Sequence, residues 1–159
     1  MKQTDWKIIY TSYSGAVKRA VHLLSKEAGQ YLIRENGVYR IYVLPCEKEG
    51  CAVGKNAFFV SLYEDSPFIR QHVAAGEIRE NGYLVKIIPN PEDAEGRLVL
   101  LTAHSAQQLF YAVVHFLDDF IPEHAPFHGS NQMPQLIFDG VLPEYCHTQA
   151  PDRKVRSIF

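Results

Sequence analysis

Apolar and polar residues alternate in several short runs of this chain, and each such run predicts a β-strand. The first run is residues 6–10, which are rich in β-branched and aromatic side chains. Two more runs flank Asn36-Gly37, a dipeptide that tolerates the positive φ angles of a type I′ turn, so residues 30–44 predict a β-hairpin. Four further strands are expected, at residues 57–64, 83–89, 98–102 and 135–140. Residues 98–102 are continuously apolar, as in a strand buried on both faces.

Apolar residues at helical spacing predict three helices. In the first, Ser14 caps the N-terminus and Gly29 stops the helix. The second is expected to be short, about nine residues, with Ser66 as its cap, Pro67 in its first position and Gly76 as its end. The apolar stripe of the first helix consists of Val17, Ala20, Val21, Leu24 and Ala28.

The third helix carries the strongest signal. Ser105 and Gln108 have the spacing of a capping box, in which the serine hydroxyl accepts from a backbone N–H and the glutamine side chain reaches back. Pro122 is expected to end the helix. Its stripe consists of Leu109, Ala112, Val113, Phe116, Leu117, Phe120 and Ile121.

The segments between these elements are polar and rich in turn-forming residues. Residues 45–56 and 123–133 predict loops, and residues 90–97 predict an acidic surface turn. The segment after residue 140 is irregular, with a strand at 154–159. The pentapeptide IRENG occurs at residues 33–37 and 78–82, but the similarity does not extend beyond it, so it is interpreted as one turn chemistry used twice and not as a repeat.

The order β-α-β-β-β-α-β-β-α-β predicts an α+β fold, a single-layer mixed β-sheet with helices packed mainly on one face. The 159 residues fit one domain. A net charge of −2 gives no basic field that would attract nucleic acid or an anionic membrane. No long apolar run indicates a membrane span or a signal peptide. Cys46, Cys51 and Cys146 are too few and too widely spaced for a disulfide framework, which favours reduced thiols and a cytoplasmic location.

The search for catalytic and binding motifs finds no glycine-rich phosphate loop, no nucleophile elbow and no zinc-protease motif. His124 and His128 are four residues apart, but the nearby prolines exclude a regular helix, and Cys146 or His147 would have to complete a metal site. Solvated loop histidines are the favoured interpretation. No catalytic, cofactor-binding or metal-binding residue is therefore assigned.

Other polar residues have structural interpretations that we favour over functional ones. His104 lies at a strand–helix junction, where capping or packing explains it. Asp118 and Asp119 are adjacent on a helix and cannot flank a glycosidic bond, and together with Glu123 they fit a solvated face. The aromatic residues on or beside the strands favour core packing over stacking on sugar rings. These are Tyr10, Tyr13, Tyr31, Tyr39, Tyr42, Phe58, Phe59 and Tyr63.

Residues 78–159 resemble the non-catalytic N-terminal domain of glycoside hydrolases of the hexosaminidase and α-glucuronidase types. Two features differ from the family pattern: Gln107-Gln108 stand where the family has a glycine, and Asp139 and Pro151 are further apart than in the family. The matching positions are Gly82-Tyr83, Thr102-Ala103, Tyr111-Ala112 through Leu117, Ile137-Phe138-Asp139, Pro151 and Arg156.

The resemblance implies a β-N-acetylhexosaminidase-like domain over residues 1–153, with residues 154–159 leading into a TIM barrel that holds the catalytic carboxylates. The expected function is thus a non-catalytic accessory domain that packs against and supports a catalytic barrel of the same parent chain, with carbohydrate as a further partner. Two alternatives stay open. One is a stand-alone module that binds a sugar or another small ligand through surface tyrosines. The other is a small metal-dependent enzyme that uses His124, His128 and a ligand from the tail.

Overall fold

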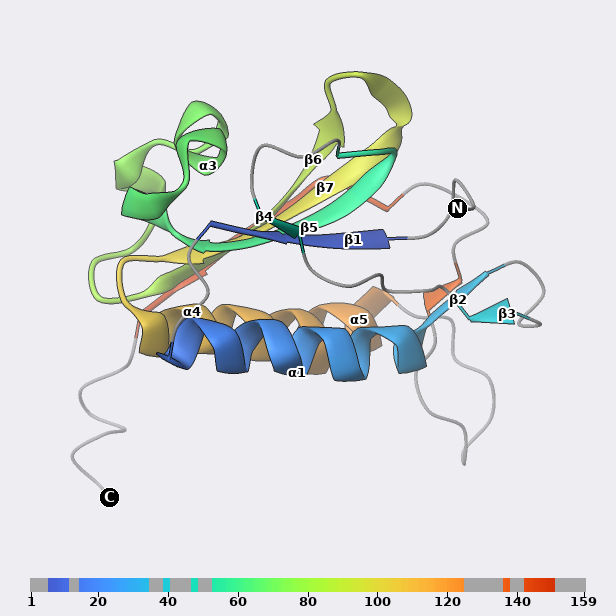
Figure 1. The fold of residues 1–159 in the computed structure, drawn as a ribbon, viewed down its shortest axis with the longest axis horizontal. Helices are drawn as coiled ribbons and strands as arrows, with labels where there is room; N and C mark the ends of the chain where they lie inside the picture. Colours follow the sequence, from blue (N-terminus) through green and yellow to red (C-terminus); the bar gives the residue numbers. More distant parts are fainter. Residues whose placement is uncertain are drawn as a thin grey trace.

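A six-stranded mixed sheet carries the fold, with the strand order β4-β1-β5-β7-β6-β9 (Figure 1). The computed structural model of the chain describes residues 6–11, 15–34, 39–40, 47–48, 53–124, 136–137 and 142–150. Strands β4, β1, β5 and β7 run parallel to one another, whereas β6 pairs antiparallel with both β7 and β9. The strands are β1 (Trp6–Tyr10), β4 (Glu47–Lys48), β5 (Asn56–Leu62), β6 (Tyr83–Asn90), β7 (Asp93–Ala103) and β9 (Tyr145–Gln149).

Three short strands form a second sheet with the order β3-β2-β8. Strand β2 (Leu32–Arg34) pairs antiparallel with β3 (Tyr39–Arg40) and parallel with β8 (Leu136–Ile137). The β2–β3 pairing confirms the strand partners of the predicted hairpin, while its turn at Asn36-Gly37 lies outside the described residues.

The two long helices pack on one face of the main sheet (Figure 1). These are α1 (Gly15–Tyr31) and α4 (Ala106–His115), and α4 continues through a π-helical segment, η3 (Phe116–Phe120), into α5 (Ile121–His124). Within the described ranges, the helix on the opposite face is α3 (Pro67–His72), between the 3₁₀ turns η1 (Tyr63–Asp65) and η2 (Ala75–Glu77). The expected α+β class, with helices mainly on one face, is therefore present.

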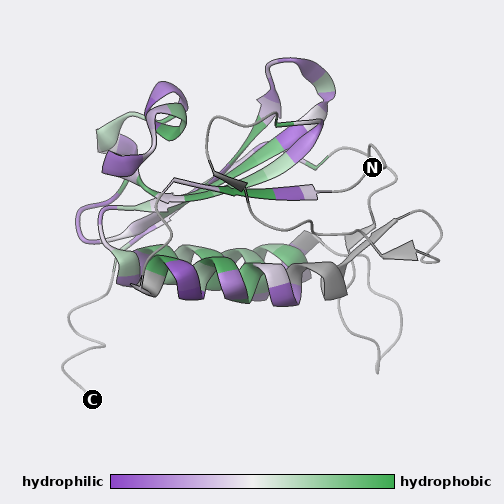
Figure 2. Ribbon diagram, viewed as in Figure 1, coloured by the Kyte–Doolittle hydropathy of each residue, from purple (hydrophilic) through white to green (hydrophobic). Residues whose placement is uncertain are grey.

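Side-chain alternation along the strands produces two hydrophobic clusters, one on each face of the sheet. Phe58 and Val60 of β5 point into the helix layer, whereas Ala57 and Phe59 point toward α3. Strand β7 is fully buried from Leu98 to Ala103, which confirms the prediction from its continuous apolar run. Figure 2 shows this distribution, with hydrophobic residues along the strands and hydrophilic ones at the hairpin tip and around α3.

Several boundaries differ from the sequence-based expectation. Helix α1 runs past Gly29 to Tyr31, and α3 has six residues because the chain turns extended at Val73, before Gly76. The long helix passes through Pro122 to His124. In η3 the N–H of Ile121 donates to the carbonyl of Phe116, five residues back, and this widened turn leaves room for a proline ring that would clash in a regular helix.

Three segments that the sequence pattern predicts as loop or irregular chain are strands in the structure. Residues 47–48 form β4 on the edge beside β1. The acidic turn at 90–97 is mostly strand, because β6 ends at Asn90 and β7 begins at Asp93, which leaves Pro91 and Glu92 as the turn. Residues 145–149 form the edge strand β9. Its Tyr-Cys-His-Thr-Gln sequence lacks apolar alternation, because an edge strand need not bury either face completely. The expected strand at 154–159 lies outside the described residues.

Candidate functional site

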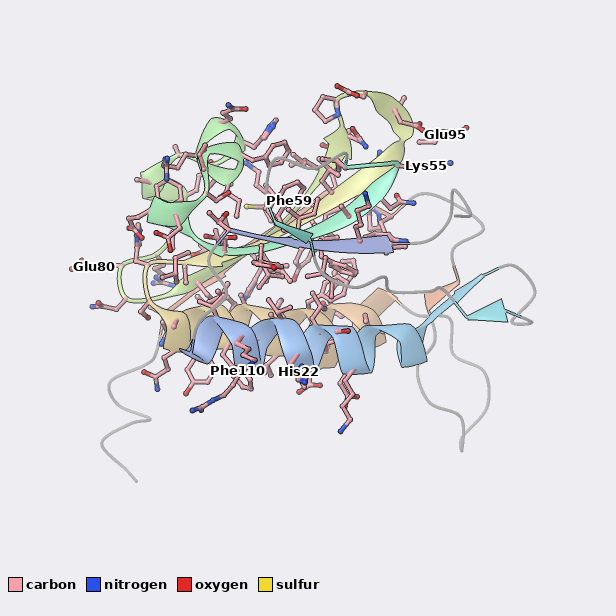
Figure 3. All side chains as sticks on the ribbon, viewed as in Figure 1. His22, Lys55, Phe59, Glu80, Glu95 and Phe110 are labelled. Atoms are coloured by element: carbon pink, nitrogen blue, oxygen red, sulfur yellow. The ribbon has the colours of Figure 1, made fainter. Side chains whose placement is uncertain are left out.

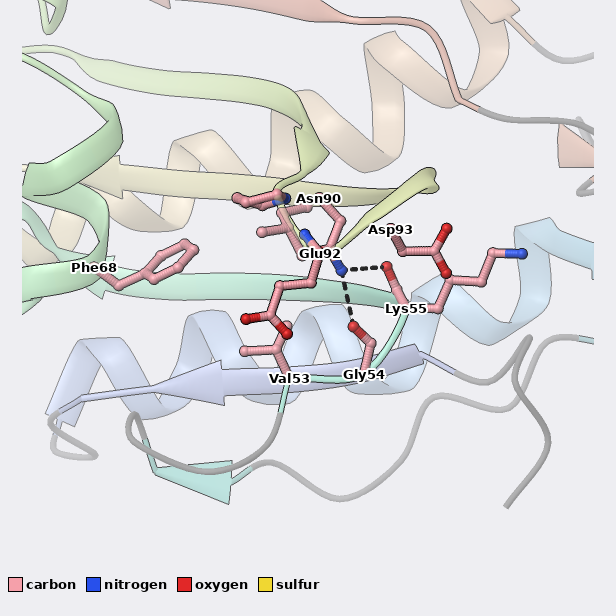
Figure 4. Close-up of a pocket in the computed structure, with 9 residues that line it drawn as sticks. Val53, Gly54, Lys55, Phe68, Asn90, Glu92 and Asp93 are labelled. Carbon is pink, nitrogen blue, oxygen red and sulfur yellow. Dashed lines mark hydrogen bonds between the residues drawn. The ribbon is translucent and has the colours of Figure 1, made fainter.

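A pocket of about 550 Å³ lies beside the β6–β7 hairpin, on the face of the sheet opposite the long helices (Figure 4). Three segments far apart in the sequence form its walls: residues 53–55 before β5, Phe68 of α3, and the hairpin residues 90–93. Leu98 of β7 also lines it. Figure 4 shows the Phe68 ring facing the hairpin across the pocket. We refer to this space as the hairpin pocket.

The walls of the hairpin pocket are held together by the buried Asn90. Its side-chain amide donates to the backbone carbonyls of Gly54 and Lys55, at 2.8 and 2.9 Å, and its carbonyl oxygen accepts from the backbone N–H of Glu92 at 2.9 Å. One side chain thus ties the hairpin to the start of β5. Gly96 adds to this junction, because a Cβ there would lie 2.2 Å from the carbonyl oxygen of Lys55.

The ionisable groups of the hairpin pocket are mostly acidic. Glu92 and Asp93 line it together with Lys55. The Lys55 ammonium is 3.6 Å from the carboxylate of Glu95, which does not line the pocket. In Figure 4 the Glu92 side chain turns back toward Val53, whereas the Lys55 side chain extends away from the pocket. The polar side chains that face the space are therefore chiefly hydrogen-bond acceptors.

A second candidate site lies at the carboxyl ends of the parallel strands β5 and β7. The chain after β5 leads to α3 on one face, whereas the chain after β7 leads to α4 on the other. Open α/β sheets bind ligands at such reversals, outside the carboxyl ends of the strands. Glu64 follows β5 and His104 follows β7, and the His104 Nδ1 is in short hydrogen-bond contact with the Glu64 carboxylate.

The environment of Glu64 favours its charged form. Slight burial opposes ionisation, but the hydrogen bond with His104, and the charges of His104 and Arg70, lower the pKa of Glu64 below its ordinary value. The Tyr63 ring packs edge-on against His104, with ring centroids 5.4 Å apart. Both side chains of the pair reach solvent, with exposed fractions of 39% for His104 and 58% for Glu64. Ser105, and not His104, caps α4 by accepting from the Gln108 N–H at 3.3 Å.

A pocket of about 500 Å³ adjoins His104 and is lined by the second IRENG segment. Asn81 has a φ of 58°, and a Cβ on Gly82 would lie 2.0 Å from the Gln149 carbonyl oxygen. The Arg79 N–H donates to the Thr148 hydroxyl at 2.8 Å. These contacts fix the segment against β9, so the second IRENG copy is a turn, as expected, and also a pocket wall.

A third group of ionisable side chains joins α4 to the edge strand β9. The imidazole rings of His115 and His147 stack in parallel, with centroids 3.9 Å apart and an interplanar angle of 3°. The Tyr145 hydroxyl is 2.8 Å from the His115 Nε2. The Asp119 carboxylate lies 3.0 Å from the His115 Nδ1, one helical turn along the same helix.

The buried position of His115 favours a neutral ring. Desolvation, followed by the nearby His147, lowers the pKa of His115, and the carboxylates of Asp119 and Glu123 oppose this shift only in part. Desolvation and the same two carboxylates raise the pKa of the Tyr145 hydroxyl. A tyrosine with a raised pKa is a poor base or nucleophile, so this group is better suited to holding β9 than to catalysis.

The structure describes only some of the residues that the sequence analysis weighed as metal ligands or acidic site residues. His147 stacks on His115, and Cys146, its neighbour on β9, is exposed. His128 and the His124 side chain lie outside the described residues. Asp118 is exposed as expected, whereas Asp119 interacts with His115 and is not merely a solvated residue. Among the described residues, no three His, Cys, Asp or Glu side chains come together in a way that could hold a metal ion.

Among the aromatic residues weighed for stacking on sugar rings, those whose side chains the structure describes point inward. Phe58 and Phe59 are buried, Tyr10 packs against the core, and the Tyr63 hydroxyl donates to the Val73 carbonyl at 2.9 Å. The side chains of Tyr13, Tyr31, Tyr39 and Tyr42 lie outside the described set. Glu64, His115 and the hairpin pocket were not found from the sequence, although the four-residue spacing of His115 and Asp119 on a helix was a usable signal.

No protein-family model matches the sequence, and no curated protein matches it either. None of the helices in the described ranges is both long enough and apolar enough to cross a membrane.

Proposed function

We propose that this chain is a non-catalytic accessory domain of a carbohydrate-active glycoside hydrolase, of the β-N-acetylhexosaminidase-like type, which packs against the catalytic barrel and supports it. The observation that carries the proposal is an apolar patch on the side of α4 that faces away from the sheet. Tyr111 lies in this patch and is 42% exposed. Among the described residues, it is the one large hydrophobic residue with an exposed side chain.

The patch consists of Phe110, Tyr111 and Val114, which we call the outer patch. These positions share one side of α4, opposite the buried stripe that includes Leu109, Ala112 and Val113. Phe110 and Val114 are partly buried, and Phe110 also packs against the core with part of its ring. In Figure 3, Phe110 projects from the helix layer on the side away from the sheet. Contiguous apolar surface of this kind typically marks an interaction site.

The neighbouring surface of α1 gives the outer patch a polar border. Helix α1 packs against α4, and its exposed residues include Lys18, Arg19, His22 and Lys26. An apolar centre beside a charged rim is the usual arrangement of a protein interface. The basic rim predicts that the docked surface of the barrel is acidic around an apolar centre.

The proposal includes a cytoplasmic location for the parent enzyme.

The experiment that tests this proposal combines this chain with the barrel of the parent protein, produced separately. Docking predicts that each part raises the thermal unfolding temperature of the other, because a partner that binds only the folded state stabilises it by mass action. A change of Tyr111→Lys should reduce this effect. Hydrolysis of aryl glycosides by this chain alone, or an unfolding temperature that does not respond to the barrel, would count against the proposal.

A further inference from the structure

The hairpin pocket has properties that the docking role does not use. It lies on the face of the sheet opposite the outer patch, so its interpretation does not depend on that role. Its size falls within the range of small-molecule sites, about 300–1,000 Å³. Its walls are apolar at Val53, Phe68 and Leu98 and acidic at Glu92 and Asp93.

Internal contacts hold the pocket in shape without a ligand. The bonds of Asn90 fix the hairpin to residues 54 and 55. The Phe68 ring stacks on Phe59 of β5, with centroids 4.2 Å apart and an interplanar angle of 8°. Because both walls are anchored to the sheet, a ligand would not have to order them, which removes one cost of binding.

The side-chain groups that face the pocket are mainly hydrogen-bond acceptors, and this imbalance indicates the kind of ligand. Both N–H groups of the Asn90 amide are already used by backbone carbonyls. The Lys55 ammonium is turned toward Glu95 and away from the space. The Glu92 carboxylate, by contrast, has no hydrogen bond or ion pair to any other described side chain. A matching ligand therefore brings hydrogen-bond donors.

Charge restricts the ligand further. Glu92 and Asp93 contribute two negative charges to the lining, and Lys55 contributes one positive charge that Glu95 partly neutralises. An anion would meet like charges at short range, whereas a cation would be attracted. The apolar walls favour a cation with a hydrocarbon frame over a bare metal ion.

We propose that the hairpin pocket binds a small organic ammonium ligand. The protonated amine lies against the Glu92 carboxylate, and the frame of the ligand packs between Phe68, Val53 and Leu98. Asp93 contributes its charge at the rim. The proposal adds a ligand site on the face of the sheet that docking leaves open. This site does not use the surface tyrosines of the sugar-binding module considered in the sequence analysis.

The test uses pairs of ligands that have the same shape and differ in charge. Glucosamine is compared with glucose, and benzylamine with benzyl alcohol, by titration into the ¹⁵N-labelled chain while amide chemical shifts are followed. The amines should give saturable shifts at residues 53–55 and 90–93, and the neutral partners should bind much more weakly. Raising the ionic strength should weaken amine binding, because salt screens exposed charges.

Two variants assign the effect to the pocket. Glu92→Gln should weaken amine binding about tenfold, since it removes a charge-assisted hydrogen bond. Glu144→Gln makes the same chemical change on an exposed residue that lines neither pocket and should leave the affinity unchanged. The proposal would be overturned if the neutral partners bound as tightly as the amines, or if Glu92→Gln bound the amines as tightly as the unmodified chain. It would also be overturned if neither amine gave saturable binding. The ligand pairs decide the question even if a variant fails to fold.

Discussion

At the scale of single residues, the second IRENG segment shows two different uses of an Asn-Gly pair. Asn81 takes the left-handed backbone conformation, with a φ of 58°. Gly82 is required for space, because its backbone passes directly against Gln149 at the end of β9. The sequence predicted the turn from the first property, but the second depends on a strand more than sixty residues away and has no local signal.

This difference leads to a prediction for two glycines. Gly82→Ala should lower the free energy of unfolding by roughly 1–3 kcal/mol or more, because the added methyl group meets backbone that cannot move cheaply. Gly76→Ala places a methyl group in open space and should change stability little. Urea unfolding of both variants measures the contrast. Equal effects of the two substitutions would show that β9 does not lie against Gly82.

The buried His115 predicts a specific pH dependence of stability. Desolvation, followed by His147, lowers its pKa below the ordinary value of 6.5, so the folded protein keeps the ring neutral. Between the folded and unfolded pKa values the unfolded chain binds more protons. The free energy of unfolding must therefore fall as the pH drops from about 7 toward 5. The burial of His72, together with the charge of Lys86, lowers its pKa and acts in the same direction.

The contribution of His115 is isolated by comparing variants. The fall in stability between pH 7 and 5 should be smaller in His115→Gln than in the unmodified chain. The exposed His22 of α1 provides the control, and His22→Gln should retain the full pH dependence. The groups that face His115 are Asp119 and Glu123 on its own helix, and Tyr83, Tyr145 and His147 on the strands. An unchanged pH profile in His115→Gln would contradict a neutral buried ring.

At the scale of elements, local chemistry predicted where helices begin better than where they end. Ser66 accepts from the Ile69 N–H at 3.1 Å and Ser105 accepts from the Gln108 N–H at 3.3 Å, as their spacing predicted. The ends depend on tertiary packing. Helix α1 continues past Gly29 because glycine disfavours a helix only by roughly 1 kcal/mol, which packing can outweigh.

Edge strands were the elements that the sequence did not predict. Strands β4 and β9 occupy the two edges of the main sheet. Central strands such as β7 have a clear hydrophobic pattern because both faces are covered. An edge strand owes its conformation to pairing with a neighbour, here β9 with β6, and pairing leaves little trace in the local pattern. The candidate sites were missed for the same reason, because Glu64 meets His104, and Phe68 meets the hairpin, only through strand order.

The cap of α4 allows a direct test at the element scale. Ser105→Ala should lower the free energy of unfolding by about 1 kcal/mol, because the Gln108 N–H loses its acceptor. Ser25 lies on the exposed side of α1, within the helix, so Ser25→Ala should be neutral or slightly stabilising. Thermal or urea unfolding distinguishes the two. A loss in Ser25→Ala as large as that in Ser105→Ala would argue against the cap.

At the scale of the whole molecule, the two faces of the sheet have different surfaces. The long helices pack on one face, and α4 presents the outer patch on the side away from the sheet. The other face is only partly covered by α3, and the hairpin pocket lies between α3 and the β6–β7 hairpin. Our two proposals assign the docking of a protein to the first face and the binding of a small molecule to the second.

The most direct test of the central proposal is the affinity of this chain for the catalytic barrel of the parent protein, measured by isothermal titration calorimetry. We expect a saturable one-to-one complex that Tyr111→Lys weakens at least about tenfold, as is typical for an aromatic anchor at an interface. Gln71→Lys adds the same charge on the exposed side of α3, on the other face of the sheet, and should have no effect. The absence of a complex, or equal affinities of the two variants, would contradict docking through α4.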